Sequence, residues 1–319
     1  MLSRTATHLF WLGRYIERAE TMARLLEVGA RNALMPDIGG GYRNDWKAIL
    51  QATGSLDAFE TKYRDTVQRN IETFLFFDEE NPSSVSSCIA MARENARVVR
   101  TALTSQVWDA INIAYQEMRE MRRTERSKLS LAELAEWTQR SCATIRGAIA
   151  ATQLRNDGYH FMGLGVALER GDNTARLLDV KYYVLLPSLS YVGSGLDKSQ
   201  WVTLLRSMSA HGAYTWTYKG EITAARIAHF LILNREFPRS LLTTVQKTND
   251  HLDALARGYA QHGATRAQTA ARTLLSELAE ATVEDVFDEG LHEFLIRYMG
   301  LNAEIAATVQ DTYLQGIPA

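Results

Sequence analysis

Apolar residues recur at three- and four-residue spacing along almost the whole chain, which is the spacing that one face of an α-helix presents. The pattern predicts helices over residues 5–34, 44–53, 65–77, 83–104, 106–126, 130–155, 158–186, 197–213, 219–233, 238–259, 265–281 and 283–315. Runs that alternate apolar and polar residues, as half-buried strands do, are scarce. The chain is therefore expected to be all-α.

Proline, glycine and capping residues mark where these helices should begin and end. Pro36-Asp-Ile-Gly-Gly-Gly follows the first predicted helix, and Pro187 and then Gly193-Ser-Gly follow the helix over 158–186. These segments are expected to be loops. Ser130 stands three residues before Glu133, which is the spacing of a capping box at the start of a helix.

The second half of the chain repeats part of the first. Leu12–Val28 and Leu164–Val180 align at an offset of 152 residues, with nine identities in seventeen positions. Weaker matches continue downstream at offsets of 155 and 156. A repeat of this length indicates two copies of one helical unit. We expect two pseudo-symmetric helical-bundle repeats, residues 1–155 and 156–319, packed together as one large domain.

Several positions shared by the two copies are charged. On a helical wheel most of them form a stripe beside the apolar face. The candidate residues are Glu17, Arg18, Glu20 and Arg24 in the first copy, and Glu169, Arg170, Asp172 and Arg176 in the second. A half-buried salt-bridge network between the copies would restrain these positions. A ligand site lined by both copies would restrain them equally, so both interpretations stay open.

Composition narrows the class of protein. The 319 residues are 46% hydrophobic and 23% charged, which suffices for a sizeable core. The net charge of −2 argues against nucleic-acid binding. The chain has no apolar run long enough to cross a bilayer and no signal-peptide pattern, so a cytoplasmic location without membrane contact is expected. Cys88 and Cys142 form neither a zinc nor a disulfide pattern and are expected to be small buried residues.

Motifs for metal and nucleotide binding are weak or missing. Glu289-x-x-His292 matches one part of the carboxylate-bundle metal motif, but the chain lacks the remaining parts. Neither a phosphate-binding loop nor a dinucleotide-binding glycine pattern occurs. We therefore expect no metal and no cofactor. His8 and His160, which occupy matching places in the repeat, are expected to be hydrogen-bonded core histidines.

The two copies of the charged helix carry a family resemblance. Trp11-Leu-Gly-Arg-Tyr-Ile-Glu-Arg-Ala-Glu-Thr-Met-Ala-Arg-Leu-Leu and Leu168-Glu-Arg-Gly-Asp-Asn-Thr-Ala-Arg-Leu-Leu resemble the bacterial alpha-E family, named for an all-helical domain with a Glu-Arg signature. Arg93-Glu-Asn-Ala-Arg and Phe237-Pro-Arg-Ser also fit it, so the resemblance covers essentially the whole chain. By motif position, the signature residues are Glu17, Arg18, Glu169 and Arg170. Val166 departs from the family pattern, which has an arginine that would match Arg14.

The resemblance implies a biosynthetic context. Family members are typically encoded beside a circularly permuted ATP-grasp amidoligase-like protein and a transglutaminase-like protease, and are proposed to help make or modify a peptide or related amide. We therefore expect an accessory or substrate-binding partner of such a ligase, whose arginines hold carboxylates of a peptide-like ligand. One alternative is an all-helical enzyme that uses paired Glu and Arg residues in a cleft between the repeats. Another is a structural scaffold with a buried salt-bridge network. The sequence leaves substrate and oligomeric state open.

Overall fold

The structure is a computed structural model that describes residues 1–34, 46–185, 195–259 and 263–314. Every regular element in these ranges is a helix, so the expected all-α fold is confirmed. The loops expected at Pro36, Pro187 and Gly193 lie outside the described residues.

Nine long helices carry the fold in the described part of the chain. They are α1 (Ser3–Ala33), α5 (Val85–Val98), α6 (Ser105–Arg123), α7 (Leu131–Thr152), α8 (Asp157–Leu185), α9 (Gly195–Ser207), α12 (Leu241–Gly258), α13 (Arg266–Glu280) and α15 (Leu291–Val309). The shorter α-helices are α2 (Trp46–Ala52), α3 (Leu56–Lys62), α4 (Gln68–Glu72), α10 (His211–Tyr218), α11 (Ala224–Ala228) and α14 (Val283–Glu289). Three π-helical turns, η1 (Thr73–Phe77), η5 (His229–Leu233) and η6 (Gln310–Leu314), each continue a preceding helix, and the 3₁₀ turns are η2 (Arg100–Ala102) and η3 (Arg126–Lys128).

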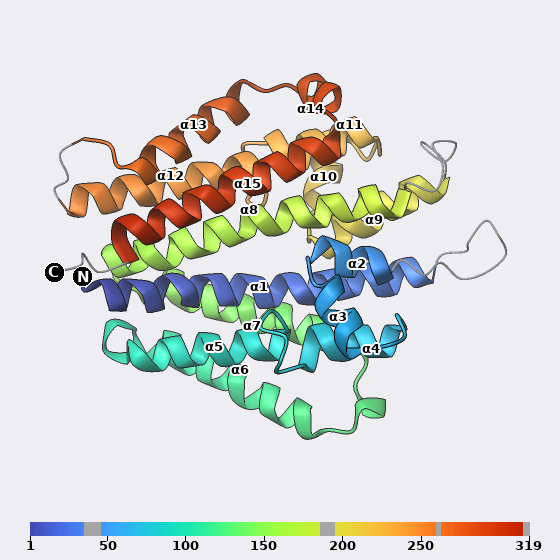
Figure 1. Ribbon diagram of the computed structural model, residues 1–319, viewed down its shortest axis with the longest axis horizontal. Coiled ribbons are helices and arrows are strands. Elements are labelled where there is room, and N and C mark those ends of the chain that lie inside the picture. The colour runs from blue at the N-terminus through green and yellow to red at the C-terminus, as the bar shows by residue number, and fades with distance from the viewer. Residues whose placement is uncertain (35–45, 186–194, 260–262, 315–319) are drawn as a thin grey trace.

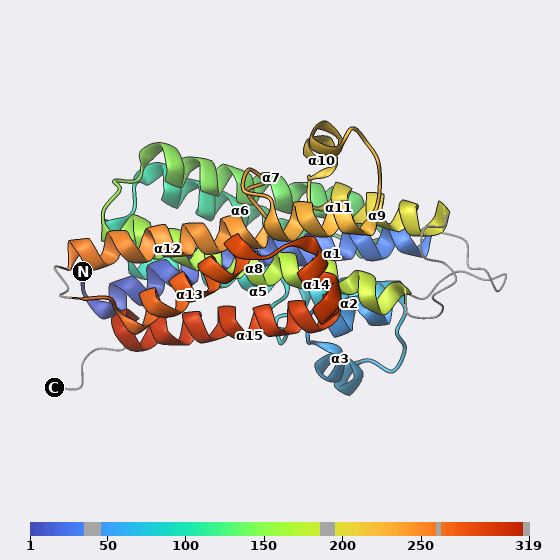
Figure 2. The ribbon, with the colours of Figure 1, turned by 90° about the horizontal axis from the view of Figure 1, so that it is seen from above.

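The two longest helices form the middle of the molecule. α1 and α8 lie side by side and run in the same direction, with α5 and α6 on the outer side of α1 and α12 and α13 on the outer side of α8 (Figure 1). α1 packs against α5 and α7, whereas α8 packs against α12 and α15. Seen from above, α12, α13 and α15 lie over α8 (Figure 2). The central position of α1 and α8 means that few of their side chains can reach solvent.

Side-chain caps explain where several helices begin. The Ser130 hydroxyl accepts the backbone N–H of Glu133, and the Glu133 side chain accepts the backbone N–H of Ser130, so the expected capping box is confirmed. Thr265 and Thr282 form similar boxes at α13 and α14. Each box satisfies backbone donors that the first helical turn leaves free.

Backbone conformation corrects several predicted boundaries. The helix expected over 197–213 breaks at Ser209, whose φ of 55° is left-handed, and the one over 283–315 breaks at Gly290, with φ of 95°. The helix expected over 219–233 begins only at Ala224, after Lys219 adopts a φ of 54°. α3 was not predicted. Apolar spacing is insensitive to a single residue that reverses the backbone, because the pattern resumes one turn later.

One hydrophobic core joins both halves of the chain. It includes Leu12 and Leu26 from α1 and Leu164 and Leu178 from α8. Cys88 and Cys142 are free and buried, as expected, and burial raises the pKa of both thiols. In the described ranges, no helix is both long enough and apolar enough to cross a membrane.

Candidate functional site

Two glycines let the central helices touch. A Cβ atom on Gly13 would lie 2.3 Å from the carbonyl oxygen of Met162, and one on Gly165 would lie 2.2 Å from the carbonyl oxygen of Phe10. Neither space could hold a methyl group, because a backbone oxygen cannot move aside as a flexible side chain can. The backbones of α1 and α8 therefore meet at this crossing. The charged residues one turn further along each helix are consequently brought within reach of the opposite helix.

Glu17 lies at this crossing with no solvent exposure. Arg170 of α8 donates to both of its carboxylate oxygens, from Nε at 2.9 Å and from Nη2 at 2.8 Å. Arg239, from the segment before α12, donates at 2.8 Å. Arg146 of α7 lies 3.5 Å away. Three guanidinium groups from three separate elements thus surround one buried carboxylate.

Glu20 shares part of this arginine shell. Its carboxylate accepts from Arg239 at 2.7 Å and from Arg24 at 2.5 Å, and it also pairs with Arg146. Glu20 is 1% exposed. Arg24 donates further to the backbone carbonyl of Ser207, at the end of α9. Four arginines therefore surround two carboxylates, and we call Glu17, Glu20 and these arginines the Glu17 cluster.

Glu169 forms a smaller group on the other side of the crossing. Arg14 donates from Nε at 2.6 Å, and Arg18 donates from Nε at 2.6 Å and from Nη2 at 3.1 Å. Glu169 is 2% exposed, whereas the two arginine side chains are 16% and 20% exposed. We call these three residues the Glu169 cluster. Signature residues of each helix thus pair with the signature residues of the other.

The remaining two candidates stand apart from both clusters. Asp172 pairs with Arg176 at 2.6 Å along α8, and its side chain is 20% exposed. Arg176 also donates to the backbone carbonyl of Ala52, at the end of α2, at 3.0 Å. The structure therefore brings six of the eight candidates into two ion-paired clusters and leaves Asp172 and Arg176 as a local pair on the same helix.

Electrostatics hold the buried carboxylates ionised. Burial alone would raise the pKa of Glu17, but the charges of Arg170 and Arg239 outweigh it and hold that pKa well below its usual range. Burial likewise opposes ionisation of Glu169, and Arg14 and Arg18 overcome it, so its pKa is lowered. The pKa of Glu20 is also lowered, with Arg239 as the largest stabilising charge. These carboxylates are poor proton acceptors at neutral pH.

Three arginines of the two clusters were not among the eight candidates. Arg14 was noted only as the residue that Val166 replaces at the matching position of α8. Arg146 comes from α7 and carried no signal in the alignment of the two charged segments, because it lies beyond the residues that align. Arg239 lies in the segment Phe237-Pro-Arg-Ser, and the family resemblance of that segment was a first signal for it. Charge balance offers a second signal, because a carboxylate buried at a helix crossing needs partners from outside its own helix.

Histidine and metal chemistry lie outside these clusters. His8 Nδ1 is 2.8 Å from Asn95 Oδ1, and His160 Nδ1 is 3.1 Å from His251 Nδ1. Both histidines are partly buried and hydrogen-bonded. His292, from the discounted metal motif, contacts Asp179 at 2.7 Å. The described residues contain no group of three or more His, Cys, Asp or Glu side chains placed to hold a metal ion.

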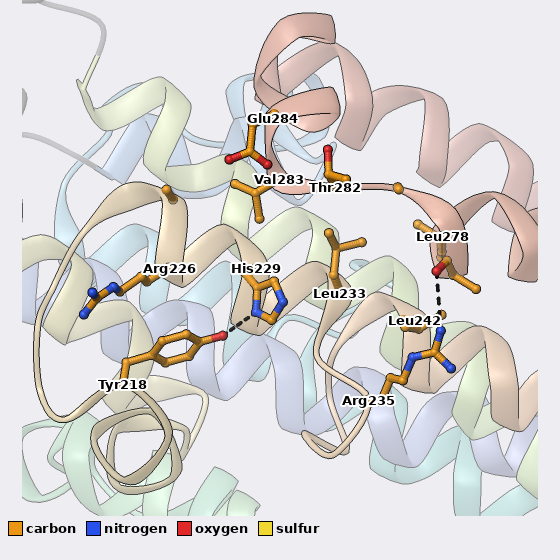
Figure 3. A pocket seen from close by; sticks show the side chains of 13 residues that line it. Tyr218, Arg226, His229, Leu233, Arg235, Leu242, Leu278, Thr282, Val283 and Glu284 are labelled. Atoms are coloured by element: carbon orange, nitrogen blue, oxygen red, sulfur yellow. Dashed lines mark hydrogen bonds between the residues drawn. The ribbon is translucent and has the colours of Figure 1, made fainter.

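A pocket of about 570 Å³ opens between η5, α12, α13 and α14 and contains none of the eight candidates. Figure 3 shows Tyr218 pointing at His229, with Glu284 facing them from the far wall. The Tyr218 hydroxyl hydrogen-bonds His229 Nδ1. Arg226 pairs with Glu221 at 2.5 Å, and Arg235 donates to the carbonyl of Ala279 at 3.4 Å. Its polar side chains thus largely pair with one another or with neighbouring groups.

Comparison with known proteins identifies the family of this chain. The model of the family Alpha-E, described as a predicted alpha-helical domain with a conserved ER motif, matches residues 1–314. The chain belongs to the Alpha-E family. In this chain, Glu17-Arg18 and Glu169-Arg170 are the two Glu-Arg pairs in the central helices, and each pair is divided between a buried carboxylate and a guanidinium that reaches across the crossing.

The curated relatives that match this Alpha-E chain are longer than it is. Uncharacterized proteins of Mycobacterium bovis and Mycobacterium tuberculosis are 24% identical to it over 335 residues, an alignment that covers 97% of this chain. The chain spans 36% of the length of these relatives. No solved structure matches it significantly.

Proposed function

We propose that this Alpha-E chain is a non-catalytic accessory partner of an ATP-grasp amidoligase-type system that makes or modifies a peptide or related amide. The observation that carries the proposal is the state of Glu17, which has no exposure and is surrounded by Arg170, Arg239 and Arg146. A carboxylate sealed in this way can neither contact a substrate nor exchange a proton with it. The ligase would supply the bond-forming chemistry, and the Alpha-E chain would bind the ligase or its carboxylate-bearing substrate.

The enzyme alternative is less well supported. It requires Glu17 and Glu169 to act as acid or base in a cleft between the helices. Both are almost completely buried, both engage at least two guanidinium groups, and both have a lowered pKa. General acid–base catalysis favours a pKa near the working pH and a path to the substrate. The scaffold alternative agrees better with this geometry, and we assign the two clusters a structural role within the accessory protein.

We also infer that residues 1–155 and 156–319 are copies of one ancestral unit. Reciprocal contacts support this inference. Arg18 pairs with Glu169 as Arg170 pairs with Glu17. Likewise, Arg24 donates to the last carbonyl of α9, as Arg176 does to the last carbonyl of α2. The contacts of the crossing glycines are reciprocal as well, because Gly13 faces the carbonyl of Met162 and Gly165 faces the carbonyl of Phe10. The π-turns η1 and η5 stand 156 residues apart, each a few residues before a serine that caps a long helix.

Co-expression tests the accessory role. The chain is produced with the ATP-grasp ligase-like protein of its own gene neighbourhood, and separately with the transglutaminase-like protein. We expect both proteins to be recovered from the cytoplasmic fraction. We expect the ligase to co-elute with this chain in size-exclusion chromatography at micromolar concentration, with ATP in the buffer. An ATP-grasp ligase from an unrelated pathway serves as the control. Clean separation from the cognate ligase, with or without ATP, would contradict the proposal.

A substitution separates the accessory role from the enzyme alternative. If Glu17 were a catalytic acid or base, Glu17→Gln would keep the free energy of unfolding and abolish turnover in the reconstituted system. We expect instead that Glu17→Gln lowers the free energy of unfolding, so that any loss of turnover follows from the loss of stability. Glu136→Gln, at an exposed residue that lies 3.7 Å from Arg140, is the matched control for loss of one carboxylate charge.

A further inference from the structure

A second pocket opens directly beside the Glu17 cluster. It has a volume of about 440 Å³ and lies between α7, α8 and α12. Arg146 and Arg170, which pair with Glu17 on the inner side, line this pocket, and Lys247 of α12 adds a third cation. Ile149 is among the side chains of its apolar wall. The pocket therefore combines positive charge with an apolar surface.

The cations of this pocket are not fully balanced by the protein. Four guanidinium groups surround only two carboxylates in the Glu17 cluster, which leaves an excess of positive charge. No carboxylate lies within ion-pair distance of Lys247 in the part of the chain that the structure describes. Burial lowers the pKa of Lys247, and the charge of Arg170 lowers it further. Glu17 and Asp250, a carboxylate that also lines the pocket, act in the opposite direction without reversing the shift. An anion in the pocket would relieve this repulsion.

Comparison of α8 with α1 shows why there is room for a ligand. At the offset of 152 residues, Gly163 and Ala167 correspond to Trp11 and Tyr15. On α1 the rings of Trp11 and Tyr15 pack together, with centroids 5.5 Å apart, and Arg14 lies 5.3 Å over the Trp11 ring. On α8 the ring of His251 occupies the space over Gly163, whereas the small side chain of Ala167 leaves open the space that Tyr15 fills on α1 and lines the pocket.

The imidazole beside the small residues adds a neutral polar group. A Cβ on Gly163 would lie 2.3 Å from Nε2 of His251, so only glycine lets this ring approach α8. Burial lowers the pKa of His251 to about 4, and His160 adds to the shift. The ring is therefore uncharged at neutral pH. It adds no positive charge to the pocket wall, and its Nδ1 is engaged by His160 Nδ1 at 3.1 Å.

We propose that the pocket between α7, α8 and α12 binds a small peptide-like molecule through its carboxylate groups, with Arg146, Arg170 and Lys247 as the anion-binding residues. Two guanidinium groups already oriented by buried carboxylates lose little freedom when they bind a second anion. The apolar wall suits a peptide side chain. This inference deepens the proposed function by naming the ligand class, but it is tested on the isolated chain. Failure to bind the ligase would leave it intact.

Isothermal titration calorimetry of the full chain tests the site. The probe is N-acetyl-leucyl-glutamate, which carries two carboxylates and one apolar side chain. The control ligand is N-acetyl-leucyl-glutaminamide, which has the same shape without charge, and inorganic phosphate forms a third arm. We expect the dicarboxylate to bind about tenfold or more tightly than either of the others, because charge-assisted hydrogen bonds are lost in the amide and apolar contacts are lost in phosphate. Equal binding of dicarboxylate and amide would overturn the proposal, and equal binding of phosphate would overturn its peptide part.

Variants locate the binding. Lys247→Met removes the unpaired cation, and we expect it to weaken binding of the dicarboxylate about tenfold or more. Ala167→Phe refills the pocket as Tyr15 does on α1, and we expect it to abolish binding. Lys128→Met removes an exposed lysine at a distant turn and should leave affinity unchanged. If Ala167→Phe fails to fold, Lys247→Met and Lys128→Met still decide the question, and equal effects of these two would overturn the proposal.

Discussion

Glu17 and Glu169 hold matching places in the two central helices, yet their surroundings differ. Glu17 and Glu20 have four arginine partners between them, which come from α1, α7, α8 and the segment before α12, and two of the four contact both carboxylates. Glu169 has two arginine partners, both from α1 and both partly exposed. Arg14 forms an ion pair with Glu169. Val166 stands at the matching position of α8, and its apolar side chain cannot pair with Glu17. The same motif therefore lies in a network of four arginines and two carboxylates around Glu17, and in a group of two arginines and one carboxylate around Glu169.

The difference shows how a buried charge constrains its neighbourhood. The charge of a carboxylate buried at a helix crossing must be balanced by a cation, but that cation can come from any segment whose arginine reaches it. The Glu17 cluster recruits arginines from distant segments, so it ties α7 and α12 to the central pair. The Glu169 cluster ties α8 only to α1. We therefore expect the two clusters to respond differently to the same substitution.

The largest expected effect is the loss of Glu17. Glu17→Gln leaves Arg170 without its carboxylate partner in a buried site, and leaves Arg239 and Arg146 with Glu20 alone. Removing one member of a buried pair costs about 3–5 kcal/mol. Glu169→Gln should cost less, because Arg14 and Arg18 can turn toward water. Urea unfolding followed by circular dichroism measures both. Equal losses for the two variants would show that the clusters are energetically equivalent despite their different partners.

The pH dependence of the free energy of unfolding should also show the contribution of the buried carboxylates. The folded pKa values of Glu17, Glu20 and Glu169 are lowered, so their contribution to stability is full above the unfolded pKa of about 4.3 and is lost as the pH falls below it. We expect the free energy of unfolding to fall by several kcal/mol between pH 5 and pH 3. The decline should be shallower in Glu17→Gln, which has one of these groups fewer. An identical pH profile in that variant would contradict the assignment.

The glycines of the crossing should, in contrast, be equivalent. Gly13→Ala and Gly165→Ala each drive a methyl group into a backbone carbonyl of the other helix, and we expect each to destabilise the protein by about 1–3 kcal/mol or more. Thermal unfolding compares them. Gly147→Ala is the control, because its Cβ would meet nothing within 4 Å. A large difference between the two crossing glycines would mean that the helices approach each other less evenly than the geometry indicates.

The smallest effect is expected at Asp172. Its pair with Arg176 is partly exposed and joins residues four apart on one helix, and such pairs contribute about 0.3–0.5 kcal/mol. Asp172→Asn should therefore change the free energy of unfolding by less than about 1 kcal/mol. Glu20→Gln, at the matching position of α1, should cost several times more because Glu20 is buried. Chemical denaturation of the two variants side by side checks this ratio.

Much of the fold could be anticipated from the order of apolar residues. Periodicity predicted the long helices, and Ser130 with Glu133 predicted the start of α7. The breaks at Ser209 and Gly290 could not be anticipated, because one left-handed residue leaves the apolar pattern on either side unchanged. The short helix α3 was missed for a related reason, since a single helical turn or two carries too few positions to show a period.

The candidate site was anticipated in part. The repeated Glu-Arg pairs identified Glu17, Arg18, Glu169 and Arg170 before any geometry was known. Asp172 matched Glu20 in charge, yet the shorter side chain stays near solvent whereas Glu20 is enclosed. Two aligned positions can therefore carry the same charge and still differ in how far their side chains are buried. Burial depends on which other segments cover the helix.

By itself, the sequence determined that this chain is helical, that two of its segments share a charged motif, and that the motif belongs to the Alpha-E family. These properties depend on residues close together in the chain or on direct comparison of one segment with another. Only the tertiary structure decided that α1 and α8 cross at two glycines, that Arg146 and Arg239 complete the Glu17 cluster, and that a cationic pocket lies beside it. These arrangements depend on contacts between residues on different helices, most of them far apart in the chain, which local patterns do not encode.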